Sequence, residues 1–314
     1  MNCRAIITTV SHPDRMAVVA LLAALAQLAY AQQGTYDWDV VPDTYPGVEF
    51  AAESVDTPRV MDVFCARIDA TNPRIRFHAP PRCADWMENS VETLRQTTRD
   101  FVRESRSLGM NMVVAINADA FQPWPAPWNE STPTDLRGLA VSEGVVVSPA
   151  TAEPSFVIGD DARPAIVSAP TNPDDVQTAV SGFAIVLMDG TAIEGKPETH
   201  PRTGIGLSRD SRYVLFMVID GRRHASQGAT TREVGEWLLH FGAYTGLNMD
   251  GGGSATLARW DETAPGDGVE LVNHPVGDGT NWLKFPPEKE AESYSTSERA
   301  NGNSIGVYLL PKDP

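Results

Sequence analysis

The amino-acid sequence predicts an α+β fold in which one mixed domain contains many strands and a few helices. Of its 314 residues, 42% are hydrophobic, which is enough to build a core. Segments with strand patterns outnumber helical ones and do not alternate with them regularly, as a doubly wound parallel sheet would require. No internal repeat and no linker rich in Gly, Ser or Pro divides the chain.

The first 31 residues predict a secretory signal peptide. Arg4 and Arg15 precede an apolar stretch at 16–30, and a small-x-small cleavage pattern ends at Ala31. The alternative is an N-terminal membrane anchor, but the stretch is shorter than the roughly 20 apolar residues that a spanning helix needs. We therefore expect cleavage after Ala31, a secreted or periplasmic mature domain at 32–314, and no stable membrane span in it.

Charge and cysteine content narrow the class of protein further. The chain has 25 Lys and Arg against 41 Asp and Glu, a formal charge of −16, which argues against a nucleic-acid partner or attachment to anionic lipid. Three cysteines are too few for a disulfide scaffold. Because Cys3 leaves with the signal peptide, Cys65 and Cys83 are predicted to form one disulfide; the alternative is two buried thiols.

Two segments have the apolar periodicity of helices. Residues 90–108 place apolar side chains on one face, with Asn89 and Glu92 as a cap and Gly109 as a stop. Residues 231–241 form the second helix, which ends at Gly242.

Strands are predicted by short apolar or alternating runs between turn residues. They are expected at 65–69, 75–78, 112–116, 139–147, 155–158, 182–188, 204–208, 213–219 and 304–309. The Pro-containing segment 122–135, with Trp124 and Trp128, is expected to be a loop. Residues 258–300 are expected to be irregular and polar.

Two polar segments lie next to predicted strands. Asn117 and Asp119 follow an apolar strand and point to the same side, which suits either a site or a turn. Arg202 precedes a strand with glycines and could present its planar guanidinium to a phosphate or carboxylate. An isolated Arg is more often a surface charge or a structural ion-pair partner.

A third segment, 219–230, runs from an apolar strand to the second helix. Thr230 and Glu233 match a capping box, so Glu233 is expected to satisfy backbone donors and not to act as a catalytic acid. Ser226 and Thr230 come just before the helix N-terminus, where an anion is favoured.

The fourth segment, 247–256, contains Asp250 followed by three glycines, Gly251 to Gly253. Consecutive glycines add nothing to a core, but they let the backbone approach a ligand or direct N–H groups at an anion. The pattern is neither a phosphate loop nor a dinucleotide fingerprint, and Ser254 is not in a nucleophile elbow. A tight structural turn is the alternative.

No cofactor is predicted. The histidines lack the spacing of metal ligands, and no cysteine is near them. Asp119, Asp220 and Asp250 could share a calcium ion, although no spaced oxygen-ligand loop is present.

Taken in order, the four segments resemble the phosphodiester glycosidase family. The pattern is Asn-x-Asp-x-Phe, Pro-Arg-Thr-x-x-Gly, Asp-Gly-Arg with Ser-x-Gly-x-Thr, and Asn-x-Asp-Gly-Gly-Gly-Ser-x-Thr. Residues 298–306 also resemble the closing Arg-x-x-x-Asn-x-x-Gly element of the family, so the resemblance covers roughly 60–310. It implies a surface cleft and hydrolysis of sugar-1-phosphodiesters, such as α-GlcNAc-1-phosphate diesters, between the anomeric carbon and the phosphate oxygen.

The resemblance also implies site residues. Catalytic positions are expected at Asp119, Asp250, Arg202 and Asp220. Substrate-binding positions are expected at Asn117, Thr203, Ser226, Thr230, Asn248, Gly251, Gly252, Gly253 and Ser254.

The hydrolysis of a sugar-1-phosphodiester suggests a separate role for each group of these residues. Because the leaving group is a weakly basic phosphate monoester, holding the phosphate matters more than a strong general acid, which suits Arg202 and the glycine N–H groups. Asp250 or Asp119 would stabilise the cationic sugar or activate water. Trp124 and Trp128 either stack on a sugar or pack their loop onto the domain.

Two other functions stay open at this point. One is a non-catalytic protein that binds glycan or phosphate at a surface, suggested by the tryptophan loop and by Ala120, where the family usually has a bulkier residue. The other is a phosphodiesterase that cleaves the P–O bond.

Overall fold

The computed structural model describes residues 38–40, 45–83, 91–123, 129–169, 174–292 and 298–312. The predicted signal peptide, the cap at Asn89 and the tryptophans Trp124 and Trp128 lie outside this range. The predicted α+β class is confirmed, because strands dominate the described residues and their pairings are antiparallel.

The largest sheet has eight strands. Their order is β1 (Asp39–Val40), β2 (Val48–Val55), β3 (Met61–Asp69), β17 (Tyr213–Ile219), β16 (Arg202–Leu207), β18 (Thr245–Asn248), β14 (Ala184–Met188) and β15 (Thr191–Ala192). Its middle strands β16 and β17 are buried apart from their first residues, and β17 is an apolar run, as expected for strands covered on both faces.

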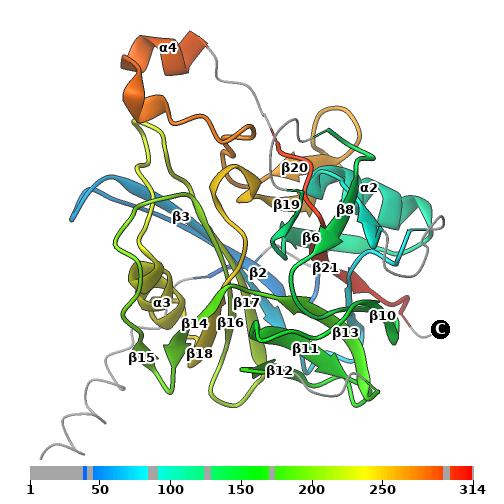
Figure 1. Ribbon diagram of the computed structural model, residues 1–314. Helices are drawn as coiled ribbons and strands as arrows, with labels where there is room; N and C mark the ends of the chain where they lie inside the picture. Colours follow the sequence, from blue (N-terminus) through cyan, green and yellow to red (C-terminus); the bar gives the residue numbers. More distant parts are fainter. Residues whose placement is uncertain are drawn as a thin grey trace, which may run out of the picture. The chain divides into compact units, whose positions relative to one another are not determined.

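Three smaller sheets complete the domain (Figure 1). The first contains β20 (Val269–Leu271), β19 (Leu257–Trp260), β6 (Met112–Asn117), β21 (Ser304–Leu309) and β4 (Ile75–His78). The second contains β10 (Val145–Ser148), β9 (Ala140–Ser142), β13 (Val176–Ser181), β11 (Ser155–Gly159) and β12 (Pro164–Val167). The third contains β5 (Thr93–Leu94), β8 (Pro133–Leu136) and β7 (Phe121–Gln122).

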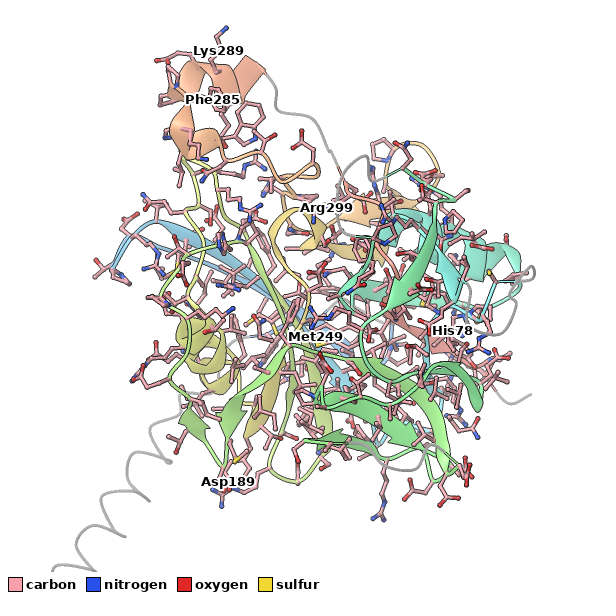
Figure 2. The ribbon with its side chains drawn as sticks, in the orientation of Figure 1. His78, Asp189, Met249, Phe285, Lys289 and Arg299 are labelled. Atoms are coloured by element: carbon pink, nitrogen blue, oxygen red, sulfur yellow. The ribbon has the colours of Figure 1, made fainter. Side chains whose placement is uncertain are left out.

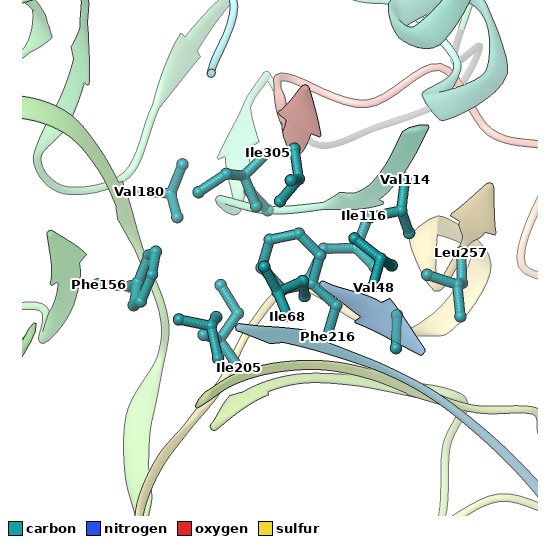
Figure 3. Close-up of a cluster of buried hydrophobic side chains, with 14 of the residues drawn as sticks. Val48, Ile68, Val114, Ile116, Phe156, Val180, Ile205, Phe216, Leu257 and Ile305 are labelled. Carbon is teal, nitrogen blue, oxygen red and sulfur yellow. The ribbon is translucent and has the colours of Figure 1, made fainter. Parts of the chain in front are cut away.

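The main core lies where the three larger sheets meet (Figure 3). Ile205 and Phe216 come from the eight-stranded sheet, Ile116 from β6, and Phe156 and Val180 from β11 and β13. All five side chains are fully buried. Burial of these side chains from all three sheets holds the end of β6 beside the starts of β16 and β21, where the polar segments lie.

Helix α3 (Thr231–His240) packs on the other face of the eight-stranded sheet (Figure 1). Along β16, Ile205 points to the core while Gly204 and Gly206 face the helix. A Cβ added at Gly204 would lie 3.1 Å from Val234 of α3, so the glycines permit this close packing. The predicted capping box is confirmed. The Thr230 hydroxyl accepts a hydrogen bond from the N–H of Glu233, and the Glu233 carboxylate accepts one from the N–H of Thr230.

The other helices differ from the sequence-based expectation. Helix α2 (Thr98–Ser107) begins eight residues later than predicted, because Thr93–Leu94 pair with β8 and Thr97 caps the helix. Residues 258–300, which are expected to be irregular, contain the strand β20 and two short helices, η2 (Trp282–Lys284) and α4 (Pro287–Glu292). Within the described residues, no helix has the length and apolar character needed to cross a membrane.

The predicted disulfide is wrong, since Cys65 and Cys83 are both free. Cys65 is fully buried in β3, and this burial raises the pKa of its thiol well above the usual value. The thiol of Cys83 contacts the carbonyl of Val91 at 3.6 Å, in the segment that leads into β5. Cys65 thus behaves as a small apolar side chain inside the largest sheet.

Candidate functional site

A cavity of about 180 Å³ opens where the glycine segment passes the start of β16. Its lining combines charged, glycine and apolar residues from segments that are far apart in the sequence. They are Phe183, His200, Arg202, Arg222, Met249, Asp250, Gly251, Gly252, Gly253 and Arg299. Figure 2 labels two of them, Met249 near the centre of the view and Arg299 above it.

Asn117, at the end of β6, holds the glycine segment in place. Its side-chain NH₂ donates to the carbonyl of Asp250 at 2.7 Å, while its Oδ1 accepts from the Thr203 hydroxyl at 2.7 Å. The same Oδ1 accepts from the N–H of Thr256 at 3.1 Å. The predicted substrate-binding residues Asn117 and Thr203 therefore join β6, β16 and the glycine segment, and they lie behind the cavity lining.

The three glycines are required by close approach of the backbone to its neighbours. A Cβ on Gly251 would lie 2.7 Å from the carbonyl of Pro201, and one on Gly253 would lie 2.0 Å from the carbonyl of Gly277. Gly252 has a φ of +64° and lies against the Arg222 guanidinium, and it begins the short helix η1 (Gly252–Ser254). The N–H of Gly252 donates to Pro201 at 2.9 Å, so the expectation that it is directed at a phosphate is not met.

Asp250 is a buried carboxylate with incomplete hydrogen bonding. Burial raises its pKa to about 6, although the Ser254 hydroxyl and the guanidiniums of Arg299 and Arg222 oppose the shift. Among the residues that the structure describes, its Oδ2 atom has no hydrogen-bond partner. A buried carboxylate with an unpartnered oxygen and a raised pKa, on a residue that lines a cavity, marks a candidate functional site.

Three arginines line the same cavity as this carboxylate, and each is oriented by main-chain carbonyl groups. Arg202 donates to Ala229 at 2.9 Å, Arg222 to Gly279 at 3.1 Å, and Arg299 to Gly277 at 3.1 Å. Arg222 also lies 3.3 Å from Nδ1 of His200.

Burial lowers the pKa of each guanidinium, that of Arg299 to about 10, so all three stay charged at neutral pH. The cavity thus carries more positive than negative charge within a chain whose formal charge is −16. This arrangement favours an anionic ligand.

Asp119 lies outside the cavity lining and fixes two segments that lead to it. Its carboxylate accepts from the N–H of Ser181 at 2.5 Å and from the side chain of Asn303. Its own N–H donates to Asn303 at 2.8 Å. Complete burial raises the pKa of Asp119 well above its usual value.

Asp220 and Ser226 are also outside the cavity lining. The Asp220 carboxylate accepts from the Asn273 side chain at 2.8 Å and from the N–H of His274 at 3.0 Å. The Ser226 hydroxyl donates to the carbonyl of Asp220 at 2.7 Å, which closes the turn after β17. Thr230 caps α3, as described above.

Asn248 and Ser254 support the cavity from behind. Asn248 is buried at the end of β18, and its Oδ1 has no hydrogen-bond partner among the described residues. The Ser254 hydroxyl accepts from Arg299 at 3.3 Å. Asp119, Asp220 and Asp250 bind different partners, and no three His, Cys, Asp or Glu side chains within the described ranges form a cluster suited to a metal.

The site residues predicted from the sequence do not include five lining residues: Phe183, His200, Arg222, Met249 and Arg299. Four of them lie in segments that carry a motif, because His200 precedes Arg202, Arg222 lies in the Asp-Gly-Arg segment, Met249 precedes Asp250 and Arg299 lies in the closing element. Phe183 has no such signal, since it lies in a predicted apolar strand.

A match to a protein-family model shows which known proteins this chain is related to. The phosphodiester glycosidase model matches residues 110–308, which is more than half of the chain and includes every residue that lines the cavity.

The chain belongs to the phosphodiester glycosidase family.

Solved structures with the same fold include a known family enzyme. The catalytic domain of zebrafish N-acetylglucosamine-1-phosphodiester α-N-acetylglucosaminidase, described as auto-inhibited by its pro-peptide, is 15% identical with a TM-score of 0.59 and 87% of each chain covered. A hypothetical protein from Synechocystis is 14% identical with a TM-score of 0.58 over 84% of this chain. This chain spans 62% of the Synechocystis chain. No relative was found among curated protein sequences.

Proposed function

We propose that this protein is an exported hydrolase that cleaves sugar-1-phosphodiesters, such as α-GlcNAc-1-phosphate diesters, at the anomeric C–O bond. One observation carries the proposal: three arginines line a single cavity together with a buried, incompletely hydrogen-bonded Asp250. Membership of the phosphodiester glycosidase family supports a glycosidase activity. Export rests on the predicted signal peptide at 1–31.

In this proposal, the arginines bind the phosphodiester and neutralise the charge that develops on it. Guanidinium groups form charge-assisted, often bidentate hydrogen bonds with phosphate oxygens. As the C–O bond breaks, its electron pair moves to the departing phosphate monoester, whose negative charge Arg202, Arg222 and Arg299 stabilise. A strong general acid is less necessary because this leaving group is weakly basic.

Asp250 acts on the sugar side of the same bond. In its ionised form, the Asp250 carboxylate stabilises the cationic anomeric carbon by its negative charge, as carboxylates do in glycoside hydrolysis. Water then supplies the oxygen that bonds to the anomeric carbon, and its proton is released. The products are a reducing sugar and a phosphate monoester.

Asp119 and Asp220 are positioning residues in this account and do not touch the substrate. Asp119 fixes Ser181 and Asn303, which precede Phe183 and follow Arg299. Asp220 fixes the start of the loop that carries Arg222.

The test measures reducing sugar and phosphate monoester released from a panel of α- and β-linked sugar-1-phosphodiesters. We expect turnover by the wild-type protein, loss of turnover in Asp250→Asn, and a large decrease in Arg222→Gln. Asp56→Asn and Arg163→Gln are matched controls, because both residues are exposed and lie outside the cavity. Binding of the panel without turnover would instead support a non-catalytic glycan-binding protein, and equal turnover in Asp250→Asn would exclude Asp250 from the chemistry.

A further inference from the structure

Phe183 is an exposed aromatic side chain in a cavity that also contains three arginines and Asp250. Its relative exposure is 46%, whereas the core aromatics Phe156 and Phe216 are fully buried. Of the exposed large apolar side chains in the described part of the chain, Phe183 alone lines the cavity. An exposed aromatic ring next to converging polar groups is a feature of ligand sites.

The backbone around Phe183 is held firmly beside Asp250. The N–H of Phe183 donates to the carbonyl of Asn248 at 2.8 Å, two residues before Asp250. A Cβ on Gly182 would lie 2.8 Å from the same carbonyl, so only glycine allows this approach. The buried Asp119 binds the N–H of Ser181 at 2.5 Å and fixes the chain on the other side of Gly182. The ring is therefore attached to a rigid part of the fold.

The two kinds of lining match the two parts of a sugar-1-phosphodiester. The arginines suit its anionic phosphate, while the exposed Phe183 ring provides apolar surface in the same cavity. A pyranose ring has a face of C–H groups that packs on an aromatic ring and an edge of hydroxyl groups. The Arg137 guanidinium lies over the Phe183 ring, 5.8 Å from its centroid, and forms an ion pair with Glu153 at 3.2 Å, so polar groups for those hydroxyls lie next to the ring.

We propose that Phe183 forms the sugar subsite, where the C–H face of a pyranose packs on the Phe183 ring while the arginines hold the phosphate. The inference rests on the proposed function and deepens it, because it states how the cavity divides between sugar and phosphate. Phe183 is thus a specificity-determining residue.

The test separates sugar binding from phosphate binding. Phe183→Ala is compared with Phe183→Tyr, which keeps the ring, and with Phe285→Ala, a matched control that is 48% exposed and does not line the cavity. Figure 2 shows Phe285 beside α4, on a different segment from Met249. For each protein, the dissociation constants of methyl α-glycosides and of inorganic phosphate are measured by titration, with KM and kcat for the best phosphodiester.

We expect Phe183→Ala to weaken glycoside binding and raise KM by about tenfold, the upper range for one aromatic contact. Phosphate binding should be unchanged. Phe183→Tyr should retain more glycoside affinity than Phe183→Ala because it keeps the ring, and Phe285→Ala should behave like the wild type. Turnover by the wild type with unchanged KM and glycoside affinity in Phe183→Ala would overturn the subsite but leave the proposed function standing. Glycoside binding that depends on Phe183, without any turnover, would support the subsite and overturn the hydrolase proposal. An equal loss of glycoside and phosphate affinity would also overturn the subsite.

Discussion

Replacement of Asp250 by Asn is expected to stabilise the folded protein at neutral pH while it removes activity. The pKa of Asp250 is raised from 3.8 to about 6 because burial disfavours the charged form. The folded protein therefore holds a proton at Asp250 that the unfolded chain has already released. The stabilising contribution of this proton is fully present below pH 3.8 and is lost as the pH rises to about 6 and above.

The size of the effect follows from the shift in pKa. A difference of about two units corresponds to about 3 kcal/mol of unfolding free energy at full ionisation. Nearly all of this loss of unfolding free energy is present at pH 7.5, but only about a fifth of it is present at pH 4. Asn cannot ionise, so the gain in stability from Asp250→Asn should be about 2 kcal/mol larger at pH 7.5 than at pH 4.

The assay is urea unfolding of both proteins at the two pH values, followed by tryptophan fluorescence. The comparison between pH values cancels any constant effect of the new amide on packing. Asp56→Asn, an exposed exchange, controls for the loss of one surface charge. If the difference in unfolding free energy between Asp250→Asn and the wild type does not grow with pH, the conclusion that ionisation of Asp250 destabilises the folded protein is refuted. Gain of stability with loss of activity is the expected trade-off at a functional site.

Three further predictions concern the same cavity. For wild-type enzyme, kcat/KM should rise as the pH increases through about 6, because the ionised form of Asp250 is the working form; a fall over that range would assign it the role of acid. Arg202→Gln and Arg222→Gln should each lower kcat/KM and phosphate affinity by about 10- to 100-fold, as expected for a hydrogen bond to a charged group. Arg163→Gln should change neither kcat/KM nor phosphate affinity. If the Arg202 and Arg222 variants have the same values as Arg163→Gln, these two arginines do not bind phosphate. Gly253→Ala should reduce the unfolding free energy by about 3 kcal/mol in urea, because its Cβ would meet Gly277 at 2.0 Å. Gly266→Ala meets no neighbour and should cost only ~1 kcal/mol from its positive φ, so equal losses would contradict the packing argument.

Local patterns in the sequence predicted much of this structure. The capping box at Thr230 and Glu233 involves neighbouring residues, so the helix start could be located from sequence. The glycine segment after Asp250 was recognised for a similar reason, since a costly local sequence indicates close approach of backbone. Helix α2 was predicted to begin too early because the pairing of Thr93–Leu94 with β8 is a tertiary contact.

The parts that could not be predicted depend on contacts between distant segments. Asp119 and Asp250 both follow strands, but only the fold determines that Asp119 binds Ser181 and Asn303 while Asp250 lines the cavity. Phe183 is brought beside Asp250 by the antiparallel pairing of β14 with β18. The free thiol of Cys65 likewise follows from its burial inside β3, which an even count of cysteines does not reveal.

The central claim is that this cavity cleaves the bond between the anomeric carbon and the phosphate oxygen. Hydrolysis of a sugar-1-phosphodiester in oxygen-18 water tests it most directly, with mass spectrometry of both products. The account predicts that the label appears in the reducing sugar and that the phosphate monoester remains unlabelled. Label in the phosphate monoester would contradict it and identify a phosphodiesterase that cleaves the P–O bond.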